Sequence, residues 1–417
     1  MKLPAIIVKS SQVKSSQVNL LPSNRDSDFR RKLYPLIFVL FSVLSLVYLF
    51  FFSSGSEYIW EVDLPTQWRI CAYTLRGIDI YPLRGSDAFI AEIGKIGRGF
   101  QASPWGCLLQ NIFYGGFLSF EAAKIYYLVA ITITLLIASF VLRAKIMPMG
   151  FGGWAFILSL FSIDFFQAVT SGNAGGMICA FLLIAWLVCD DHPYVAGVLI
   201  AFAMVKPQTA LIVCIMLLMM RRIKPLIVGA AVDIAAWFTV SVMTKKGMLE
   251  LVREFLFMPQ DKVGNPPFAG IFTLLFDDYL TAVAMSMIAG IIFVVVLYVL
   301  LPKGMPEIFK IYPAFMAVTF WCYAYSNEGY ILLLPACLCL WLMLHGRSKL
   351  FWFICAAWCY LGAHIKSITR KLFMLANPGL DIVTSRVYAR TLYELVIILV
   401  GFLICIELRR IYPEARQ

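Results

Sequence analysis

Long apolar blocks without a charged residue dominate this sequence and restrict it to few folds. Residues 33–52 and residues 282–301 are two such blocks, each about 20 residues long. A helix of about 20 apolar residues crosses the roughly 30 Å hydrocarbon core of a bilayer. A helix on the surface of a soluble domain instead carries its apolar residues as a stripe on one face. Because the blocks recur almost to the C-terminus, we predict a single all-α polytopic membrane domain.

The composition supports the same class of protein. Hydrophobic residues make up 61% of the 417 residues and charged residues only 14%, whereas soluble domains are about half apolar. The net charge of +11 is also typical of nucleic-acid-binding proteins. Here, however, the cations lie in short loops between apolar blocks, where the positive-inside bias and anionic lipid headgroups account for them. We therefore expect the lipid bilayer, and no nucleic acid, as a partner.

The sequence gives little support for a cleaved leader, a metal or a cofactor. About 32 polar and basic residues precede the first block, and no small-residue cleavage site follows closely, so we expect that block to remain as a helix. Most of the eleven cysteines lie inside apolar blocks, no CxxC pair occurs, and there are only three histidines. Cys71 and Cys107 fall in one polar stretch, where they are either free or paired.

Charge favours one arrangement of the spans. Residues 104–118 are apolar but only about 15 residues long, which suits an interfacial or re-entrant helix. If they do not cross, five basic clusters fall on the cytoplasmic side, as the positive-inside rule favours. That arrangement gives about twelve transmembrane helices. Residues 194–205 and 207–220 are both short, so they are either two spans or one helix broken at Lys206-Pro207. The basic clusters that fall on the cytoplasmic side in this arrangement are Arg143/Lys145, Arg221/Arg222/Lys224, Lys303/Lys310, Arg347/Lys349 and Arg409/Arg410.

The predicted organisation follows from this arrangement. Residues 1–32 form a basic cytoplasmic segment, residues 33–410 form the membrane domain, and residues 411–417 form a cytoplasmic tail. Residues 53–124 make a long first outer loop with interfacial helices. Both termini are then inside a cell inner (plasma) membrane, and most of the unusual polar segments converge on its outer face.

Candidate site residues lie in these outer segments. Asp63 follows the first span by about ten residues and is either a partly desolvated general base or an ordinary loop carboxylate. The turn that contains Asp79 and Tyr81 lies between Arg69, Arg76 and Arg84, and arginines bind phosphate oxygens with two donors. The alternative is a plain surface turn with solvated charges.

Four further outer-face features stand out. Lys206 interrupts about 27 apolar residues and precedes a proline, so it is either a functional cation or a side chain that reaches to the headgroups. Arg253 lies in an expected amphipathic interfacial helix. Glu328 and Tyr330 lie in a polar, aromatic-flanked turn that either lines a pocket or is a simple helix hairpin. Cations between residues 366 and 390 contradict the positive-inside bias, so they either bind a lipid phosphate or indicate a different topology.

Four of these segments resemble the GT-C membrane glycosyltransferases, specifically glycosyltransferase family 87, over roughly residues 33–345. Asp63 followed by Gly77-Ile-Asp-Ile-Tyr81 is similar to the outer-loop aspartate and Gly-x-x-x-Tyr turn of that family. Ser171-Gly-Asn173 is similar to its Gly-Gln motif, with Asn in place of Gln. The stretch from Ala196-Gly197 through Lys206-Pro207 to Arg221-Arg222 is the most specific match. The segment 325–335 is similar to a late outer turn, although that turn usually carries His where this chain reads Glu328-Gly329-Tyr330.

The resemblance implies an inverting transfer of a hexose, with mannose expected, from a polyprenyl-phosphate donor to a glycolipid or glycan acceptor. Asp63 would be the general base. Arg69, Arg76, Asp79, Tyr81, Asn173, Lys206, Arg253, Glu328 and Tyr330 would bind the substrates, with no metal and no cofactor. A transporter or flippase of lipid-linked sugars is the alternative class, and a polysaccharide ligase or polymerase is another. No inverted repeat with paired broken helices supports a transporter.

Overall fold

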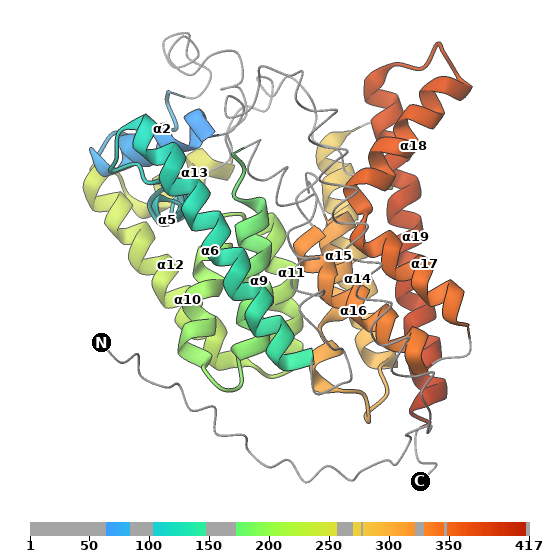
Figure 1. The fold of residues 1–417 in the computed structure, drawn as a ribbon. Helices are drawn as coiled ribbons and strands as arrows, with labels where there is room; N and C mark the ends of the chain where they lie inside the picture. The colour runs from blue at the N-terminus through green and yellow to red at the C-terminus, as the bar shows by residue number, and fades with distance from the viewer. Residues whose placement is uncertain are drawn as a thin grey trace.

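A computed structural model of the chain describes residues 64–83, 103–146, 172–256, 270–276, 278–321, 329–345 and 348–413. Every regular element in these ranges is helical, which confirms the all-α prediction for this part of the chain (Figure 1). The predicted first span and the block that begins near Phe151 lie outside the described residues. The helices are α2 (Leu64–Leu75), α4 (Gly106–Leu109), α5 (Asn111–Tyr114), α6 (Phe120–Ile146), α9 (Gly175–Val188), α10 (Pro193–Ala203), α11 (Pro207–Met219), α12 (Ile223–Thr244), α13 (Met248–Leu256), η4 (Gly270–Leu274), α14 (Tyr279–Leu300), η5 (Glu307–Phe309), α15 (Tyr312–Trp321), α16 (Gly329–His345), α17 (Lys349–Tyr360), α18 (Gly362–Ala376) and α19 (Ile382–Ile411).

Four helices among the described residues are long and apolar enough to cross a bilayer. They are α6, α12, most of α14 and most of α19, with apolar spans of 27, 22, 20 and 28 residues. The bent pair of α17 and α18 makes a fifth if it is one broken span. The chain is therefore built as a multi-pass membrane protein. Helices α9, α10, α11 and the apolar part of α16 are shorter, with between 10 and 17 residues, so the count of twelve spans stays a prediction.

The two shortest predicted spans, α10 and α11, are separate antiparallel helices. Lys206, between them, contacts Asn173 at the start of α9, while Arg222, at the end of α11, contacts Asp190 at the end of α9. Helices α9 and α11 thus run in one direction, and α10 returns between them. The alternative of one helix broken at Lys206-Pro207 is wrong, because the chain reverses there instead of continuing.

Two central helices hold the halves of the bundle together. Every residue of α9 from Gly175 to Leu187 is buried, and so is every residue of α16 from Ile331 to Met343. A helix that is apolar on all sides is stable only when other helices surround it. Helix α9 packs against α16, and α11 packs against α15, so these two contacts join the N-terminal helices to the C-terminal helices (Figure 1).

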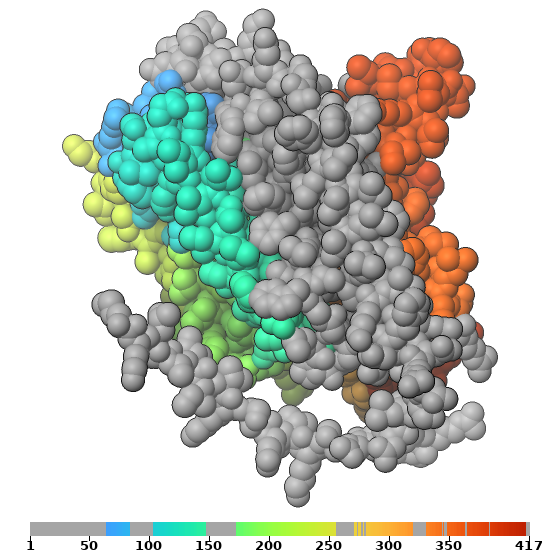
Figure 2. All heavy atoms as spheres, in the orientation of Figure 1, coloured from blue at the N-terminus to red at the C-terminus, as the bar shows by residue number. Residues whose placement is uncertain are grey.

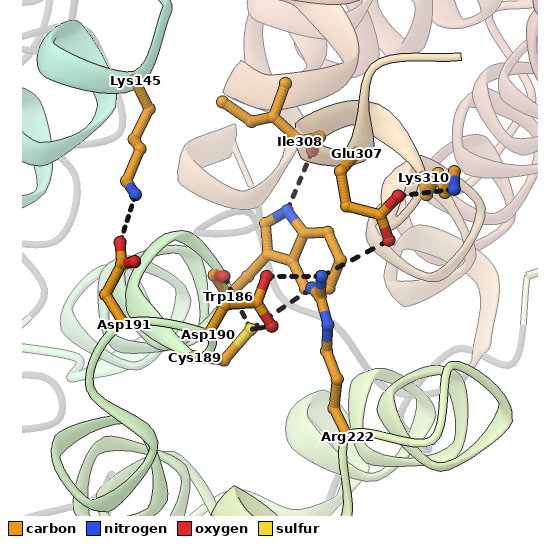
Figure 3. Close-up of polar contacts among 9 residues, drawn as sticks. All are labelled: Lys145, Trp186, Cys189, Asp190, Asp191, Arg222, Glu307, Ile308 and Lys310. Atoms are coloured by element: carbon orange, nitrogen blue, oxygen red, sulfur yellow. Dashed lines mark hydrogen bonds and ion pairs between the residues drawn. The ribbon is translucent and has the colours of Figure 1, made fainter. Parts of the chain in front are cut away.

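Paired charges close one end of the bundle (Figure 3). Arg222 lies with its guanidinium 4.1 Å from the centre of the Trp186 ring and pairs with Asp190 at 2.6 Å and Glu307 at 3.4 Å. Trp186 Nε1 in turn donates to the carbonyl of Ile308 at 2.9 Å. These contacts connect the ends of α9 and α11 to η5. We call this the Arg222 end, and we call the opposite end, where Asn173 meets Lys206, the Lys206 end.

Other basic clusters lie at the Arg222 end. Lys145, in the last turn of α6, pairs with Asp191 at 2.7 Å, and its hydrogen bond lowers the pKa of that carboxyl. Lys310 pairs with Glu307 at 2.5 Å, and Arg409 Nε donates to the carbonyl of Leu300 at 2.7 Å. These clusters share one end, as the charge-based arrangement requires. The side of the membrane that this end faces stays a prediction.

Residues 104–118 and residues 366–390 were both predicted as segments that do not cross the membrane. Within residues 104–118 the chain forms α4 and α5, which have only four residues each. Neither helix can cross a bilayer, so the prediction that this segment is not a span is confirmed. The stretch 366–390, predicted as a loop, is instead the body of α18 and the first turns of α19. The Asp381 side chain accepts from Thr384 N at 3.0 Å and starts α19, a capping signal that the run of cations obscured.

Labelling of single cysteines tests which way the bundle is inserted. We expect Cys at Pro82 or Asn377, both exposed at the Lys206 end, to react with an impermeant maleimide added to intact cells, in a cysteine-free background. Cys at Lys303, exposed at the Arg222 end, should react only after permeabilisation, because basic clusters stay in the cytoplasm. Equal labelling of all three positions in intact cells would refute a membrane-spanning arrangement. Labelling of Lys303→Cys alone would show that the bundle is inserted in the opposite orientation.

Candidate functional site

The structure brings together two of the predicted site residues, Asn173 and Lys206. Lys206 Nζ donates a hydrogen bond to Asn173 Oδ1, although the two residues are 33 positions apart in the chain. The same oxygen accepts from Gly175 N at 2.9 Å, the first backbone donor of α9. Asn173 thus helps to satisfy the start of α9 and holds the lysine side chain. The amide oxygen therefore orients the ammonium of Lys206.

Local sequence explains why the chain bends at both residues. Lys206 has an extended backbone (φ −113°, ψ 82°), and Pro207 occupies the first turn of α11. A proline disfavours a helical conformation in the residue before it and begins a helix well. Gly172 has a φ of +67°, and a Cβ there would lie 2.4 Å from the Cβ of Leu64. Only glycine allows this close approach of α2 to the chain before α9.

Two stacked tyrosines fix Asn173 from the other side. Tyr127 donates from its hydroxyl to the backbone carbonyl of Asn173 at 3.1 Å, and Ala174 N donates to the hydroxyl of Tyr114 at 2.9 Å. The two rings are parallel, with centroids 5.7 Å apart. The segment that carries Asn173 is therefore held by polar contacts from α5 and α6, and its side chain faces Lys206 as part of a fixed arrangement.

The predicted catalytic residue, Asp63, lies outside the described residues. The residue that follows it, Leu64, is fully buried and lies against Gly172. The chain therefore enters the described structure at the Lys206 end, one residue after Asp63 and beside the Gly172-Asn173 turn. The role of Asp63 as a base stays a prediction.

A second polar group surrounds the other predicted motif, the turn after α2. Asp79 Oδ1 accepts from Tyr81 N at 3.1 Å, which closes the turn, and the carboxylate pairs with Lys246. Lys246 also pairs with Glu254 of α13. Partial burial by itself would lower the pKa of Lys246, but Asp79 and Glu254 outweigh it and raise that pKa. The ion pairs connect the turn to the end of α12 and to α13.

Helix α4 connects the two polar groups. Tyr81 is buried, its hydroxyl lies 3.8 Å from the sulfur of Cys107, and burial raises the pKa of that hydroxyl. The neighbouring Gly106 packs against the backbone of Val205, the residue before Lys206. Trp105 Nε1 donates to the carbonyl of Met204 at 2.8 Å. The predicted motifs around Asp79 and Lys206 are thus both packed against one short segment.

The remaining predicted residues are less closely grouped. Arg69 is half-buried on α2, whereas Arg76, just after α2, and Arg253, on α13, are exposed. Glu328 lies outside the described residues, and Tyr330 belongs to the first turn of α16. Their substrate roles stay predictions. Cys71 and Cys107 are both buried and free, so they form no disulfide with each other.

Sequence reasoning missed two residues of this region. Lys246 follows Lys245 and Thr244 in what looks like a plain polar loop, and only folding brings it to Asp79. Trp105 packs edge-on against Trp237 of α12 and Phe255 of α13, at centroid distances of 6.3 and 6.4 Å. In the sequence, Trp105 could have been noticed as an aromatic residue next to a glycine. No spacing rule pointed to Lys246.

The described residues offer cation chemistry and no metal chemistry. No group of three or more His, Cys, Asp or Glu side chains in the described ranges is arranged to hold a metal ion. Lys206 supplies a half-buried ammonium beside a neutral amide. An ammonium with hydrogen-bond donors in a partly dry site stabilises anionic oxygens, such as those of a phosphate.

Replacing Lys246 with methionine should destabilise this end of the bundle. The change leaves the partly buried carboxylates of Asp79 and Glu254 without their cation, which should cost about 1–3 kcal/mol. The measurement is the free energy or temperature of unfolding of purified protein in detergent. Lys245→Met is the matched control, because Lys245 is exposed and adjacent in the chain. Equal stability of the two variants would show that the Lys246 ion pairs contribute nothing.

Comparisons with known proteins leave the family of this chain open. No protein-family model matches the sequence, and no curated protein or solved structure matches it either. What the chain does must therefore be argued from its own residues.

Proposed function

We propose that this protein is an integral membrane glycosyltransferase that moves a hexose from a polyprenyl-phosphate donor to a glycolipid or glycan acceptor. The observation that carries the proposal is the contact between Lys206 and Asn173 beside Leu64. It joins three of the sequence segments that resemble glycosyltransferase family 87. Leu64 precedes Asn173 by 109 residues and Lys206 follows it by 33, and nothing in their spacing required them to meet.

The chemistry of such a transfer suits a cation at this position. The acceptor hydroxyl oxygen attacks the anomeric carbon, and the bond from that carbon to the phosphate oxygen breaks. Asp63 takes the proton of the hydroxyl, and the polyprenyl phosphate leaves with the electron pair. Lys206 then stabilises the phosphate oxygens, a contribution that grows where water is excluded. The inversion follows from a single attack on the face opposite the leaving group.

The proposal includes a topology. The Arg222 end faces the cytoplasm, because its clusters obey the positive-inside rule. The Lys206 end then faces outward, and with about twelve spans both termini are cytoplasmic. A lipid-linked donor would place its chain between helices and its phosphate at the outer interface, within reach of a residue at that end. Mannose as the sugar rests on the resemblance alone.

The rival function is a transporter or flippase of lipid-linked sugars. A transporter needs a polar path through the bilayer, and membrane-embedded polar groups usually mark such a path. The two central helices, α9 and α16, are apolar and buried along their lengths. The ion pairs of Arg222 and Lys246 lie at the two ends, whereas Arg390 and Glu394 pair inside the bundle. The apolar length of α9 and α16 favours chemistry at one end over passage through the middle.

One assay separates these functions. Detergent-purified protein is incubated with radiolabelled polyprenyl-phosphate sugar and a membrane glycolipid extract, and the label in the acceptor is counted. A transferase moves the label, whereas a transporter leaves it on the donor. A polymerase or ligase would yield long products, so gel separation of the products by size distinguishes it from a transferase that adds one sugar.

Lys206→Met tests the cation directly. A hydrogen bond to a charged group contributes about 1.5–3 kcal/mol, so the apparent affinity for the donor should fall about tenfold or more. Lys303→Met, an exposed lysine at the Arg222 end, is the control for loss of one charge. If Lys206→Met keeps the affinity of the unchanged protein, Lys206 serves only to anchor the start of α11.

Asp63→Asn tests the base. The side chains have nearly the same shape, but the amide cannot accept the proton, so turnover should fall by about 10²–10⁴ with little change in stability. Glu61→Gln is the control, because Glu61 is a nearby acid outside the motif and should retain most activity. Turnover of Asp63→Asn above roughly a tenth of normal would contradict the loss expected for a general base. The base would then be sought at Asp79 or Glu328.

A further inference from the structure

The helix α18 and the first turns of α19 form a cationic hairpin at the Lys206 end of the bundle (Figure 1). In Figure 2 this hairpin, coloured orange to red, projects at the upper right of the molecule. Phe373 packs against Tyr388 with ring centroids 6.0 Å apart, and Lys366 Nζ lies 5.1 Å from the centre of the Tyr393 ring. Helix α18 thus packs on α19 in an antiparallel pair.

The side of α18 away from α19 is apolar and exposed. Ile368, Leu372 and Leu375 are 55%, 58% and 77% exposed. Their spacing of four and three residues places them on one helix face, and Lys371 borders that face. Three large apolar side chains in a row are stable at a lipid surface and costly in open water.

The length of α19 indicates the depth at which this face lies. Thirty residues make a helix of about 45 Å, some 15 Å longer than the hydrocarbon core. The apolar run of α19 continues to its Arg409-Arg410 end, so the excess lies in the first turns, beside α18. The hairpin is therefore level with the lipid headgroups at the Lys206 end.

The charge of the hairpin indicates which headgroups it meets. Residues 362–391 contain five cations and one acid, Asp381. Arg390 is held inside the bundle by Glu394 at 2.7 Å, whereas Lys371 and Arg386 are exposed. Arg370 is half-buried, and its Nε is buried without a hydrogen-bond partner. The net positive charge of the hairpin suits an anionic surface, and it lies at the end where the positive-inside bias predicts few cations.

We propose that the α18–α19 hairpin is a docking surface for anionic phospholipid headgroups. The apolar face of α18 inserts among the acyl chains, Lys371 binds phosphates at the border of that face, and Arg370 and Arg386 bind phosphates elsewhere on the hairpin. This role does not depend on the proposed transferase activity, and it holds for either orientation of the bundle. It also accounts for the cations between residues 366 and 390 without a different topology.

The test compares lipids on the purified full-length chain by native mass spectrometry, titrated with phosphatidylglycerol or with phosphatidylcholine of the same acyl chains. The variant is Arg370→Gln/Lys371→Gln/Arg386→Gln. Each cation near an anionic surface is worth roughly a fivefold change in affinity, so the triple variant should bind phosphatidylglycerol at least about fivefold more weakly. Phosphatidylcholine binding should be unchanged.

The control removes three exposed cations at the other end, as Lys303→Gln/Lys349→Gln/Arg410→Gln, and should keep the affinity at the hairpin. Gel filtration and the unfolding temperature verify that both variants fold. Equal binding of the two lipids, or equal losses in the two variants, would overturn the proposal. The proposal would also be overturned if the protein were a dimer that Ile368→Ser/Leu375→Ser converts to a monomer. The apolar face would then be an interface between copies.

Discussion

A helix that ends within a bilayer must still satisfy its terminal backbone groups, and this requirement organises the Lys206 end. Helices α9, α10 and α11 are all short, so their ends meet inside the bundle. Ala174 N and Gly175 N, at the start of α9, find acceptors in Tyr114 and Asn173. The carbonyl of Met204, at the end of α10, finds a donor in Trp105. Polar side chains are concentrated here because the backbone requires them, and the candidate site is built from the same groups.

The two ends of the bundle use their charges differently. At the Arg222 end, cations and carboxylates are paired across helices, and the pairs hold α9, α11 and η5 in register. At the Lys206 end, Lys206 contacts a neutral amide, and the carboxylates of Asp79 and Glu254 are gathered around Lys246 on the far side of α4. At both ends ion pairs connect helices, and at the Lys206 end the amide of Asn173 in addition orients an ammonium.

The sequence predicted the class of fold because membrane helices carry their signal in single uncharged blocks. It also identified Lys206, since a lysine in a long apolar run is costly without a function or a partner. It did not reveal that α18 is a helix, because the cations between residues 366 and 390 masked an amphipathic pattern. The sequence also did not predict the contact between Lys206 and Asn173 or the role of Lys246. Both depend on how α9 to α13 fold back on one another, and residue spacing does not encode that.

The depth of the candidate site follows from helix lengths. Helices α11 and α12 both adjoin the turn at Arg221 and Arg222, so they start from the same level at that end. With 13 and 22 residues, they reach about 20 Å and about 33 Å from it when nearly parallel to the bundle axis. Because α11 is nine residues shorter than α12, Lys206 lies closer to the Arg222 end than the end of α12 does.

Helices α2, α4 and α13 pack against α12. Lys206 is half-buried, and Trp105 and Gly106 pack against the two residues before it. A recessed ammonium interacts more strongly with a phosphate, because less water screens the pair. Because α9, α10 and α11 are short, their ends need polar partners for the backbone inside the bundle. The same short lengths place Lys206 at this depth.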